Sequence, residues 1–537
     1  MLKPEELGEE LLSPTDERSL EAEDTESVPS FFIKNVKRTL PTALSYDFSI
    51  TLPVLGILIT HLGYPTTAPA VVTMISTIGS LQCACVLPCA FTLGALFGEL
   101  NEKEKVLKEQ QENVITLSKE ITGLKNKIGR TPKNGVLAGL LFTPVAVLPM
   151  IFAEPVLSTL GQNEAVAASA QEFFRCYAPF FLTFSPRLAM AFVLFSSGHT
   201  TKAMLIVDSV LLATITLEYT LAFETPLALT GLGLANGFGL SCTAIGFTAY
   251  VGYKFDGFHF IKNFFSYKSE DYQQVLGFIR MGGPIILTIV SDVAVSFAMS
   301  IFAGLLSEDI LELQNIATQF VGLNAVITAA ASQTTALMAS EQRGKAKAGN
   351  LSYASIKRVA IAGIMANLVL QLPLICFSTV FSNEFSKMVG SSPDESKIRQ
   401  LLLINSAYLL IDAVRYNTLE TTRALGDNGW PSFISSTLLW CGVGISYLLS
   451  NKTDLKEQGL PLGLLIGSLL GVLVLVNRLP SSIQSARLQD SPNRSSRDDF
   501  PKTSASWCCF FNKKISVDED DPSLEYTSTD LNTQFPF

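Results

Sequence analysis

The sequence predicts an all-α polytopic membrane protein with twelve transmembrane helices in two six-helix lobes that are related by an internal repeat. Apolar side chains make up 48% of the 537 residues and charged side chains only 16%, and the mean hydropathy is +0.34. Such a chain is too apolar for a soluble protein of this size. Its apolar residues also come in blocks of about 18 to 30, the length that spans a bilayer.

The apolar blocks define the predicted order of spans and domains. The twelve spans lie at 40–62, 68–98, 135–154, 169–195, 203–223, 232–253, 276–305, 312–340, 355–381, 400–422, 431–449 and 459–477. They imply five segments: an acidic disordered tail at 1–39, an N-lobe at 40–254, an inter-lobe linker at 255–275, a C-lobe at 276–480 and a disordered tail at 481–537. The tails are polar, and they lack the apolar content that a packed core requires.

Lysine and arginine in the loops predict the orientation. The loops at 99–134, 254–275 and 341–354 are rich in these residues, whereas the loops at 63–67, 155–168, 224–231 and 306–311 have none. Positive charge is retained on the cytoplasmic side, so we expect both termini in the cytoplasm and a plasma (inner) membrane location. The first 30 residues hold ten acids and lack the basic start and apolar core of a secretory signal.

Other functional classes find no support in the sequence. The nine cysteines form no metal-binding or disulfide pattern, and the three histidines are scattered singly. Neither a catalytic triad nor a P-loop nor a Rossmann turn is present. The net charge of −9 gives no basis for nucleic-acid binding. We therefore predict a protein that is not an enzyme, carries no cofactor and binds no nucleic acid.

The predicted cytoplasmic loop at 99–134 carries an amphipathic heptad pattern. The apolar positions that repeat every seven residues, and those interleaved with them, are Leu107, Val114, Ile121, Ile128, Leu117 and Leu124. This pattern predicts one helix of about four heptads, whose apolar seam needs a partner. Two interpretations stay open. The helix lies on the membrane surface or on the protein's own loops, or residues 102–128 bind a coiled-coil partner.

A second local motif lies in the C-terminal tail. Cys508 and Cys509 are adjacent, stand among aromatic residues and precede Lys513 and Lys514. Acylation of these cysteines would attach the tail to the membrane. The alternative is that the unmodified aromatic side chains insert into the membrane interface.

Acids inside apolar spans are the main functional candidates, because an ionised side chain at mid-membrane is costly. Asp412 in span 10 shares a helical face with Tyr408, four residues before it, and Arg415, three after it. Asp292 stands alone in span 7, after Gly282-Gly283-Pro284. Each has a structural alternative. Arg415 could neutralise Asp412 as a structural pair, and Asp292 could be a neutral carboxyl in a helix contact.

Three other acids, Glu154, Glu218 and Glu224, lie near span ends. We expect their side chains to be solvated. Asp47, in the predicted cytoplasmic half of span 1, is a weaker candidate because water could reach it.

The two halves of the chain repeat each other. Placing Leu62-Gly63 on Leu306-Ser307 aligns span 1 with span 7 and sets Asp47 opposite Ser291. The turns at 196–200 and 423–428 also correspond, and with Gly198 on Gly426, Arg187 falls on Arg415. Parallel repeats of six spans place a substrate site at their interface and suit alternating access by rocking.

At these residues the sequence resembles the MATE (multidrug and toxic compound extrusion) family, NorM-like, of the MOP superfamily. The resemblance covers most of 40–480. Its motifs are Leu160-Gly161-Gln162-Asn163, Leu217-Glu218-Tyr219, Leu232-Gly233-Leu234-Ala235, Gly282-Gly283-Pro284 through Asp292, and Arg423 to Asp427 ahead of Pro431.

The resemblance implies roles for particular residues. NorM-like members use an acid eight residues after the span-7 proline and a Tyr-x-x-x-Asp in span 10 for cation coupling, which here are Asp292 and Tyr408 with Asp412. The family's span-1 acid would fall near Leu55 instead of Asp47, and a span-5 asparagine would fall near Thr214. Arg415, Arg187, Asp47 and Thr214 are expected at most to line or tune a cavity.

The function that the resemblance implies is secondary active antiport. The chain would export amphiphilic, cationic xenobiotics in exchange for Na⁺ or H⁺, the coupling ion being held at Asp292 and Asp412. Two alternatives stay open. A flippase for lipid-linked precursors, from the same superfamily, would use Arg187 and Arg415 in a basic cavity. A non-transporting membrane scaffold would recruit partners through the heptad helix and the tails.

Overall fold

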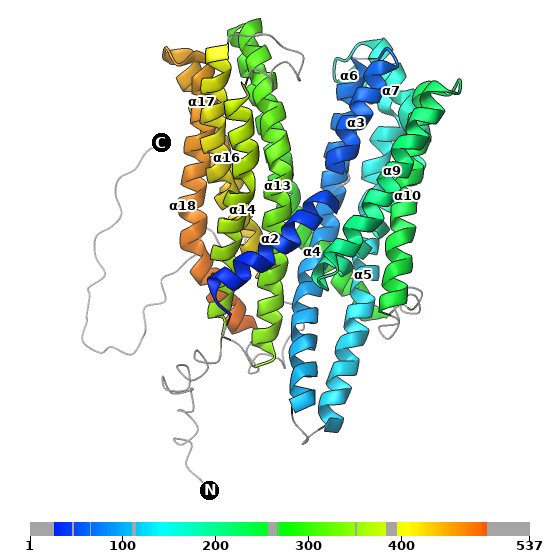
Figure 1. The fold of residues 1–537 in the computed structure, drawn as a ribbon, viewed down its shortest axis with the longest axis vertical. Coiled ribbons are helices and arrows are strands. Elements are labelled where there is room, and N and C mark those ends of the chain that lie inside the picture. The colour runs from blue at the N-terminus through cyan, green and yellow to red at the C-terminus, as the bar shows by residue number, and fades with distance from the viewer. Residues whose placement is uncertain are drawn as a thin grey trace, which may run out of the picture. The chain divides into compact units, whose positions relative to one another are not determined.

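The computed structural model describes residues 26–45, 48–64, 66–109, 114–255, 266, 268–349, 352–382 and 395–490. These residues are almost entirely helical and include no strand (Figure 1). The helices of predicted spans 1 to 6 are α2 (Val28–Ser45), α3 (Phe48–His61), α4 (Thr67–Glu109), α5 (Val114–Ile151), α6 (Ala153–Thr159), α7 (Glu164–Tyr177), the 3₁₀ helix η2 (Ala178–Thr183), α8 (Phe184–Ser196), α9 (Thr200–Phe223) and α10 (Ala228–Lys254). The helices of predicted spans 7 to 12 are α12 (Ser269–Leu306), α13 (Glu308–Lys347), α14 (Ala354–Val380), α16 (Glu395–Ala424), α17 (Gly429–Lys452) and α18 (Lys456–Asp490).

Ten stretches of helix in the described part of the chain are long and apolar enough to cross a membrane. Predicted spans 1 and 10 are the two that do not meet this criterion. Span 1 is divided between α2 and α3, and α16 carries many polar and charged side chains. The prediction of an all-α, multi-pass membrane protein is confirmed.

Helix α2 begins earlier than the sequence predicted. Its buried side chains include Phe31, Asn35, Thr39 and Thr42, which are spaced three or four residues apart and therefore share one face. Phe31 packs against apolar residues of α13, α14 and α18. The prediction of a disordered tail through residue 39 is wrong from Val28 onward. The buried face of α2 is mainly polar, so a search for apolar segments does not detect this helix.

Two other predicted boundaries also move. The predicted linker at 255–275 overlaps α12, which begins at Ser269, and α18 continues past residue 480 to Asp490. Cys508 and Cys509 lie outside the described residues, so their acylation stays a prediction.

The heptad segment forms a helical hairpin and not the single helix that we predicted. Helix α4 runs to Glu109 and α5 begins at Val114, so the two arms continue these helices and lie side by side (Figure 1). Ile121 and Leu124 on the second arm are buried in the same apolar cluster as Leu100 on the first. Ion pairs also join the arms: Lys103 to Glu120 at 2.9 Å and Lys125 to Glu104 at 2.8 Å. The apolar seam therefore packs within the chain, and a foreign coiled-coil partner stays a prediction.

Helices α4 and α13, which are predicted spans 2 and 8, cross in direct backbone contact. A Cβ atom on Gly98 would lie 2.1 Å from the carbonyl oxygen of Glu341, and one on Gly344 would lie 1.9 Å from that of Ala95. Gly98 lies three residues after Ala95, and Gly344 lies three residues after Glu341. The contact is therefore reciprocal, since the glycine of each helix meets the carbonyl group three residues before the glycine of the other. No side chain other than hydrogen fits at either glycine, and we call this contact the glycine crossing.

The turns that the repeat alignment superposes share their backbone conformation. Gly198 follows α8 with φ of 79°, and Gly426 follows α16 with φ of 89°. Both values lie in the left-handed region that ends helices and favours glycine. The two turns therefore end equivalent helices in the same way.

Candidate functional site

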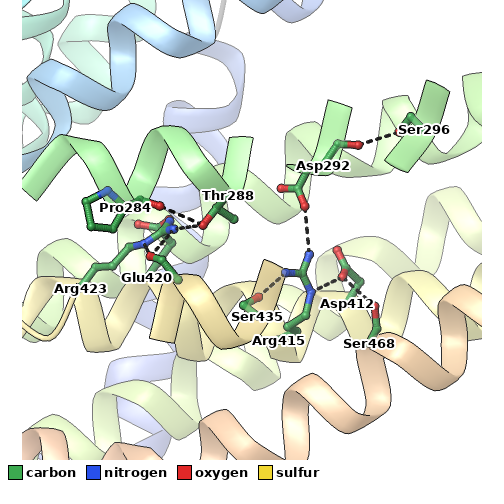
Figure 2. Close-up of polar contacts among 11 residues, drawn as sticks. Pro284, Thr288, Asp292, Ser296, Asp412, Arg415, Glu420, Arg423, Ser435 and Ser468 are labelled. Atoms are coloured by element: carbon green, nitrogen blue, oxygen red, sulfur yellow. Dashed lines mark hydrogen bonds and ion pairs between the residues drawn. The ribbon is translucent and has the colours of Figure 1, made fainter. Parts of the chain in front are cut away.

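Asp412 and Arg415 of α16 form an ion pair within one helical turn. The Nε atom of Arg415 donates a hydrogen bond of 2.6 Å to Oδ1 of Asp412, the geometry that a spacing of three residues predicts. Oδ1 of Asp412 also accepts a hydrogen bond of 3.2 Å from Ser468 of α18. The sequence prediction that this acid and this guanidinium meet is therefore confirmed (Figure 2).

The same guanidinium reaches two further helices. Nη1 of Arg415 donates a hydrogen bond of 2.6 Å to Ser435 of α17. Nη2 lies 3.7 Å from Oδ1 of Asp292 on α12, which is too long for a hydrogen bond but close enough for an ion pair. Side chains of four helices therefore meet at the Asp412–Arg415 pair, and both acids that the sequence singled out face the guanidinium (Figure 2).

The charges in this cluster do not balance. Two carboxylates face one guanidinium, so the cluster carries a net charge of −1 when all three groups are ionised. The side chain of Arg415 is 2% exposed and that of Asp412 16%, whereas that of Asp292 is 31% exposed. The surplus negative charge is therefore most accessible at Asp292, the acid that is held less closely.

Tyr408 lies one turn before Asp412 on α16 and is half-buried. Its side chain packs against an apolar cluster that includes Val295 and Met299 of α12 and Val443 of α17. A packing role is therefore evident, and a role in cation coupling stays a prediction.

The remaining predicted residues lie elsewhere. Arg187 is buried on α8, with its guanidinium carbon 5.9 Å from the ring centre of Phe184. It is not among the ion-pair or hydrogen-bond partners that converge on Arg415. Asp47 lies outside the described residues. Thr214 is buried on α9 and lines a pocket together with Asn236 of α10 and residues of α3, α4 and α7.

One acid near a span end differs from our expectation. Glu218 of α9 is fully buried and accepts a hydrogen bond from the side-chain amide of Asn236 on α10. Glycines allow this close packing: a Cβ atom on Gly239 of α10 would lie 2.2 Å from Oγ1 of Thr214. The expectation of a solvated Glu218 is therefore wrong, whereas Glu154 and Glu224 are exposed as expected.

A second ion pair on α16 was missed by the sequence reasoning. The guanidinium of Arg423 binds the carboxylate of Glu420 and donates a hydrogen bond of 2.7 Å to Thr288 of α12 and one of 3.0 Å to Ser432 of α17. Both charged side chains are buried. The spacing that drew attention to Asp412 and Arg415, an acid followed by arginine three residues later, would have found this pair as well.

Comparisons with known proteins agree with this fold. No protein-family model matches the chain. A probable multidrug resistance protein NorM from Rhizobium meliloti (strain 1021) is 22% identical over 422 residues, which are 74% of this chain and 85% of that protein. The crystal structure of a MATE protein in the straight conformation superposes with a TM-score of 0.70 at 15% identity, covering 86% of this chain and 98% of that one.

The eukaryotic MATE transporter AtDTX14 has a similar fold. Its crystal structure gives a TM-score of 0.68 at 14% identity and covers 86% of this chain and 100% of that one. The sequence similarity and the shared architecture together confirm the resemblance that the motifs predicted.

Proposed function

We propose that this chain, which resembles the MATE transporters in sequence and has their fold, is a secondary active antiporter that exports amphiphilic organic cations. The observation that carries the proposal is the cluster of Asp292, Asp412 and Arg415. It holds two carboxylates and one guanidinium between helices of a membrane protein, so it has one uncompensated negative charge. Such a charge away from water is costly, and a bound cation removes the cost.

The proposed mechanism is competition for that charge. Asp292 is the accessible acid, and its 3.7 Å separation from Arg415 leaves it open to a second cation. An inward-moving Na⁺ or H⁺ and an outward-moving organic cation would each neutralise the cluster, but only in turn. Because the net negative charge opposes closure of the site, the two lobes rock between facings only when one cation is bound.

The direction of transport rests on the charge distribution of the loops. The lysine-rich hairpin at 99–134 and the loop after α13 belong on the cytoplasmic side by the positive-inside rule. We therefore propose that both termini are cytoplasmic, that the protein lies in the plasma (inner) membrane, and that export runs away from the hairpin side. The apolar outer faces of the helices would contact membrane lipid.

The rival functions have less support. A flippase for lipid-linked anions needs free positive charge, whereas Arg415 is bound by Asp412, Ser435 and Asp292. A scaffold that recruits partners through the heptad seam needs that seam to be exposed, whereas Ile121 and Leu124 are buried inside the hairpin. Neither rival function accounts for the surplus negative charge at Asp292, whereas antiport needs such a charge to bind a cation.

Reconstitution in liposomes tests the proposal. Efflux of a fluorescent organic cation is measured under an imposed Na⁺ gradient and, separately, under an imposed pH gradient, for the wild type and for Asp292→Asn. We expect one gradient to drive efflux in the wild type and at least tenfold slower efflux in the variant, because the amide keeps the size of the side chain and removes its charge. Asp208→Asn, the same change at a half-buried acid of α9, is the matched control. Wild-type efflux in Asp292→Asn would overturn the proposal.

A further inference from the structure

Helix α16 carries the same structural unit twice. In the first unit, Arg415 binds Asp412 on its own helix, Ser435 on α17 and Asp292 on α12. In the second unit, which lies eight residues further along α16, Arg423 binds Glu420, Ser432 and Thr288 on the same three helices (Figure 2). Each arginine therefore ties α16 to both α12 and α17.

The two units differ at one position, where α12 supplies Asp292 to the first and Thr288 to the second. Thr288 precedes Asp292 by four residues, so the two side chains lie about 6 Å apart along α12. With a hydroxyl in place of a carboxylate, the second unit holds one acid and one arginine and is neutral. A proton or metal cation bound at Glu420 would take away the carboxylate that neutralises the buried Arg423, which is costly. The second unit therefore offers no site for a coupling ion.

The second unit is also the tighter connection between α12 and α16. Nη2 of Arg423 donates a 2.7 Å hydrogen bond to Thr288, whereas Nη2 of Arg415 remains 3.7 Å from Asp292. Arg423 is held in turn by Glu420 and by two hydrogen bonds to Ser432, of 3.2 and 3.0 Å. The hydrogen-bonded link between α12 and α16 thus lies one turn away from Asp292 and does not involve Asp292 itself.

We propose that Arg423, through Thr288, is a positioning residue that keeps Asp292 apart from Arg415 and so keeps it available to the coupling cation. The inference rests on the proposed function of Asp292 and Asp412. Without the clamp, Asp292 closes on Arg415 and forms a full hydrogen-bonded pair, which an incoming cation must then displace. The charged groups that act on Asp292 are Arg415, Asp412 and Arg423. From α17 and α18 this cluster receives the hydroxyls of Ser435, which binds Arg415, and Ser468, which binds Asp412.

Thr288→Val gives the sharpest test, because valine has the shape of threonine and lacks only the hydroxyl that accepts from Arg423. Both charges of the Glu420–Arg423 pair stay in place, so the variant should fold. In full-length protein in liposomes, we expect the Na⁺ or H⁺ concentration for half-maximal efflux to rise at least threefold, with the maximal rate within twofold of wild type. Thr288→Ser keeps the hydroxyl and should behave as wild type.

A second readout does not require transport. Binding of a cation to the folded protein raises its melting temperature, so the wild type is titrated with Na⁺ alone and with H⁺ alone. We expect Thr288→Val to need at least three times the cation concentration for the same rise in melting temperature. An unchanged titration, or a lower melting temperature at every concentration with an unchanged midpoint, would show that the clamp is merely structural.

The two proposals fail differently. If Asp292→Asn transports as well as wild type, the proposed function is wrong whatever Thr288→Val does. If Asp292→Asn is inactive and the half-saturating cation concentration of Thr288→Val equals that of wild type, only the positioning role is wrong.

Discussion

Arg415 holds Asp412 through a 2.6 Å hydrogen bond from its Nε atom, within a single turn of α16. Because of this bond, the two acids of the cluster have different roles. Asp412 fixes the guanidinium, which in turn neutralises it, and Asp292 remains as the surplus charge. A structural role for Asp412 is therefore compatible with a functional role for Asp292. Variants of Asp412 and Arg415 can distinguish the two roles.

The first prediction concerns Arg415→Gln alone and together with Asp412→Asn. The single change removes the guanidinium that pairs with Asp412 and faces Asp292. Breaking a buried ion pair by removing one partner typically costs about 3–5 kcal/mol, so we expect low abundance in the membrane. The double change removes one charge of each sign and should restore abundance to within about twofold of wild type. Efflux by the double variant should remain well below wild type, because the site has lost its fixed geometry around Asp292.

Abundance by immunoblot and efflux from vesicles are measured for both singles and the double. A double variant with wild-type efflux would show that Asp412 has only a structural role and that Asp292 suffices alone.

The second prediction concerns the glycine crossing. Gly344→Leu places a large side chain where even a Cβ atom would meet the carbonyl oxygen of Ala95 at 1.9 Å. Such overpacking costs about 1–3 kcal/mol, so we expect α4 and α13 to separate there. Glu99 and Lys347, which pair across this contact at 3.3 Å, are both replaced by cysteine in a background without the natural cysteines. Cross-linking between them should fall at least about fivefold.

Gly123→Leu serves as the control, because a Cβ atom at Gly123 would meet no atom within 4 Å. Undiminished cross-linking in Gly344→Leu would mean that the crossing absorbs the added side chain without opening.

The third prediction concerns the tip of the hairpin. Replacing residues 106–118 by a short glycine-serine linker keeps the ion pairs of Lys103 with Glu120 and of Glu104 with Lys125. Since these pairs and the buried Ile121 hold the arms together, we expect efflux within about twofold of wild type. Loss of efflux at normal abundance would assign the tip a direct part in transport.

The fourth prediction concerns pH and Tyr353, which lies just before α14. Its hydroxyl donates a 3.1 Å hydrogen bond to Asp490 at the end of α18. Burial, together with the charge of Asp490, raises the pKa of Tyr353 above its ordinary value. A raised pKa stabilises the folded state below the unfolded pKa, near 10, and this contribution is lost as the pH rises toward the folded pKa.

The melting temperature of the wild type should therefore fall more steeply above about pH 10 than that of Tyr353→Phe. At neutral pH the variant should be less stable by about 1 kcal/mol, the usual value of one hydrogen bond. Parallel melting curves across alkaline pH in both proteins would contradict the prediction.

Sequence patterns predicted this fold where a side chain's position depends only on its own helix. The pairing of Asp412 with Arg415 follows from their spacing, and the equivalence of the turns at Gly198 and Gly426 follows from the repeat. Contacts between helices were harder to predict. The burial of Glu218 depends on close packing against α10, where Gly239 contacts Thr214 and Asn236 binds the carboxylate, and nothing in the local pattern around Glu218 indicates it.

The hairpin and the second ion pair escaped prediction for other reasons. A heptad pattern is the same for one long helix and for two arms that fold back, so Leu107 and Ile121 alone do not distinguish them. Glu420 and Arg423 lie at the end of span 10, where charged side chains are common, and their burial by Thr288 and Ser432 is visible only in three dimensions.

The reciprocal contact of Gly98 with Glu341 and of Gly344 with Ala95 has the form of an isologous interface, in which residue i of one subunit meets residue j of the other and j meets i. Such an interface is what two identical polypeptides make around a twofold axis. A free-standing chain of half this length, with one set of six spans, could therefore dimerise through this surface in parallel orientation. In the present chain the same contact means that any substitution at Gly98 has to suit the backbone of the other half as well as that of its own.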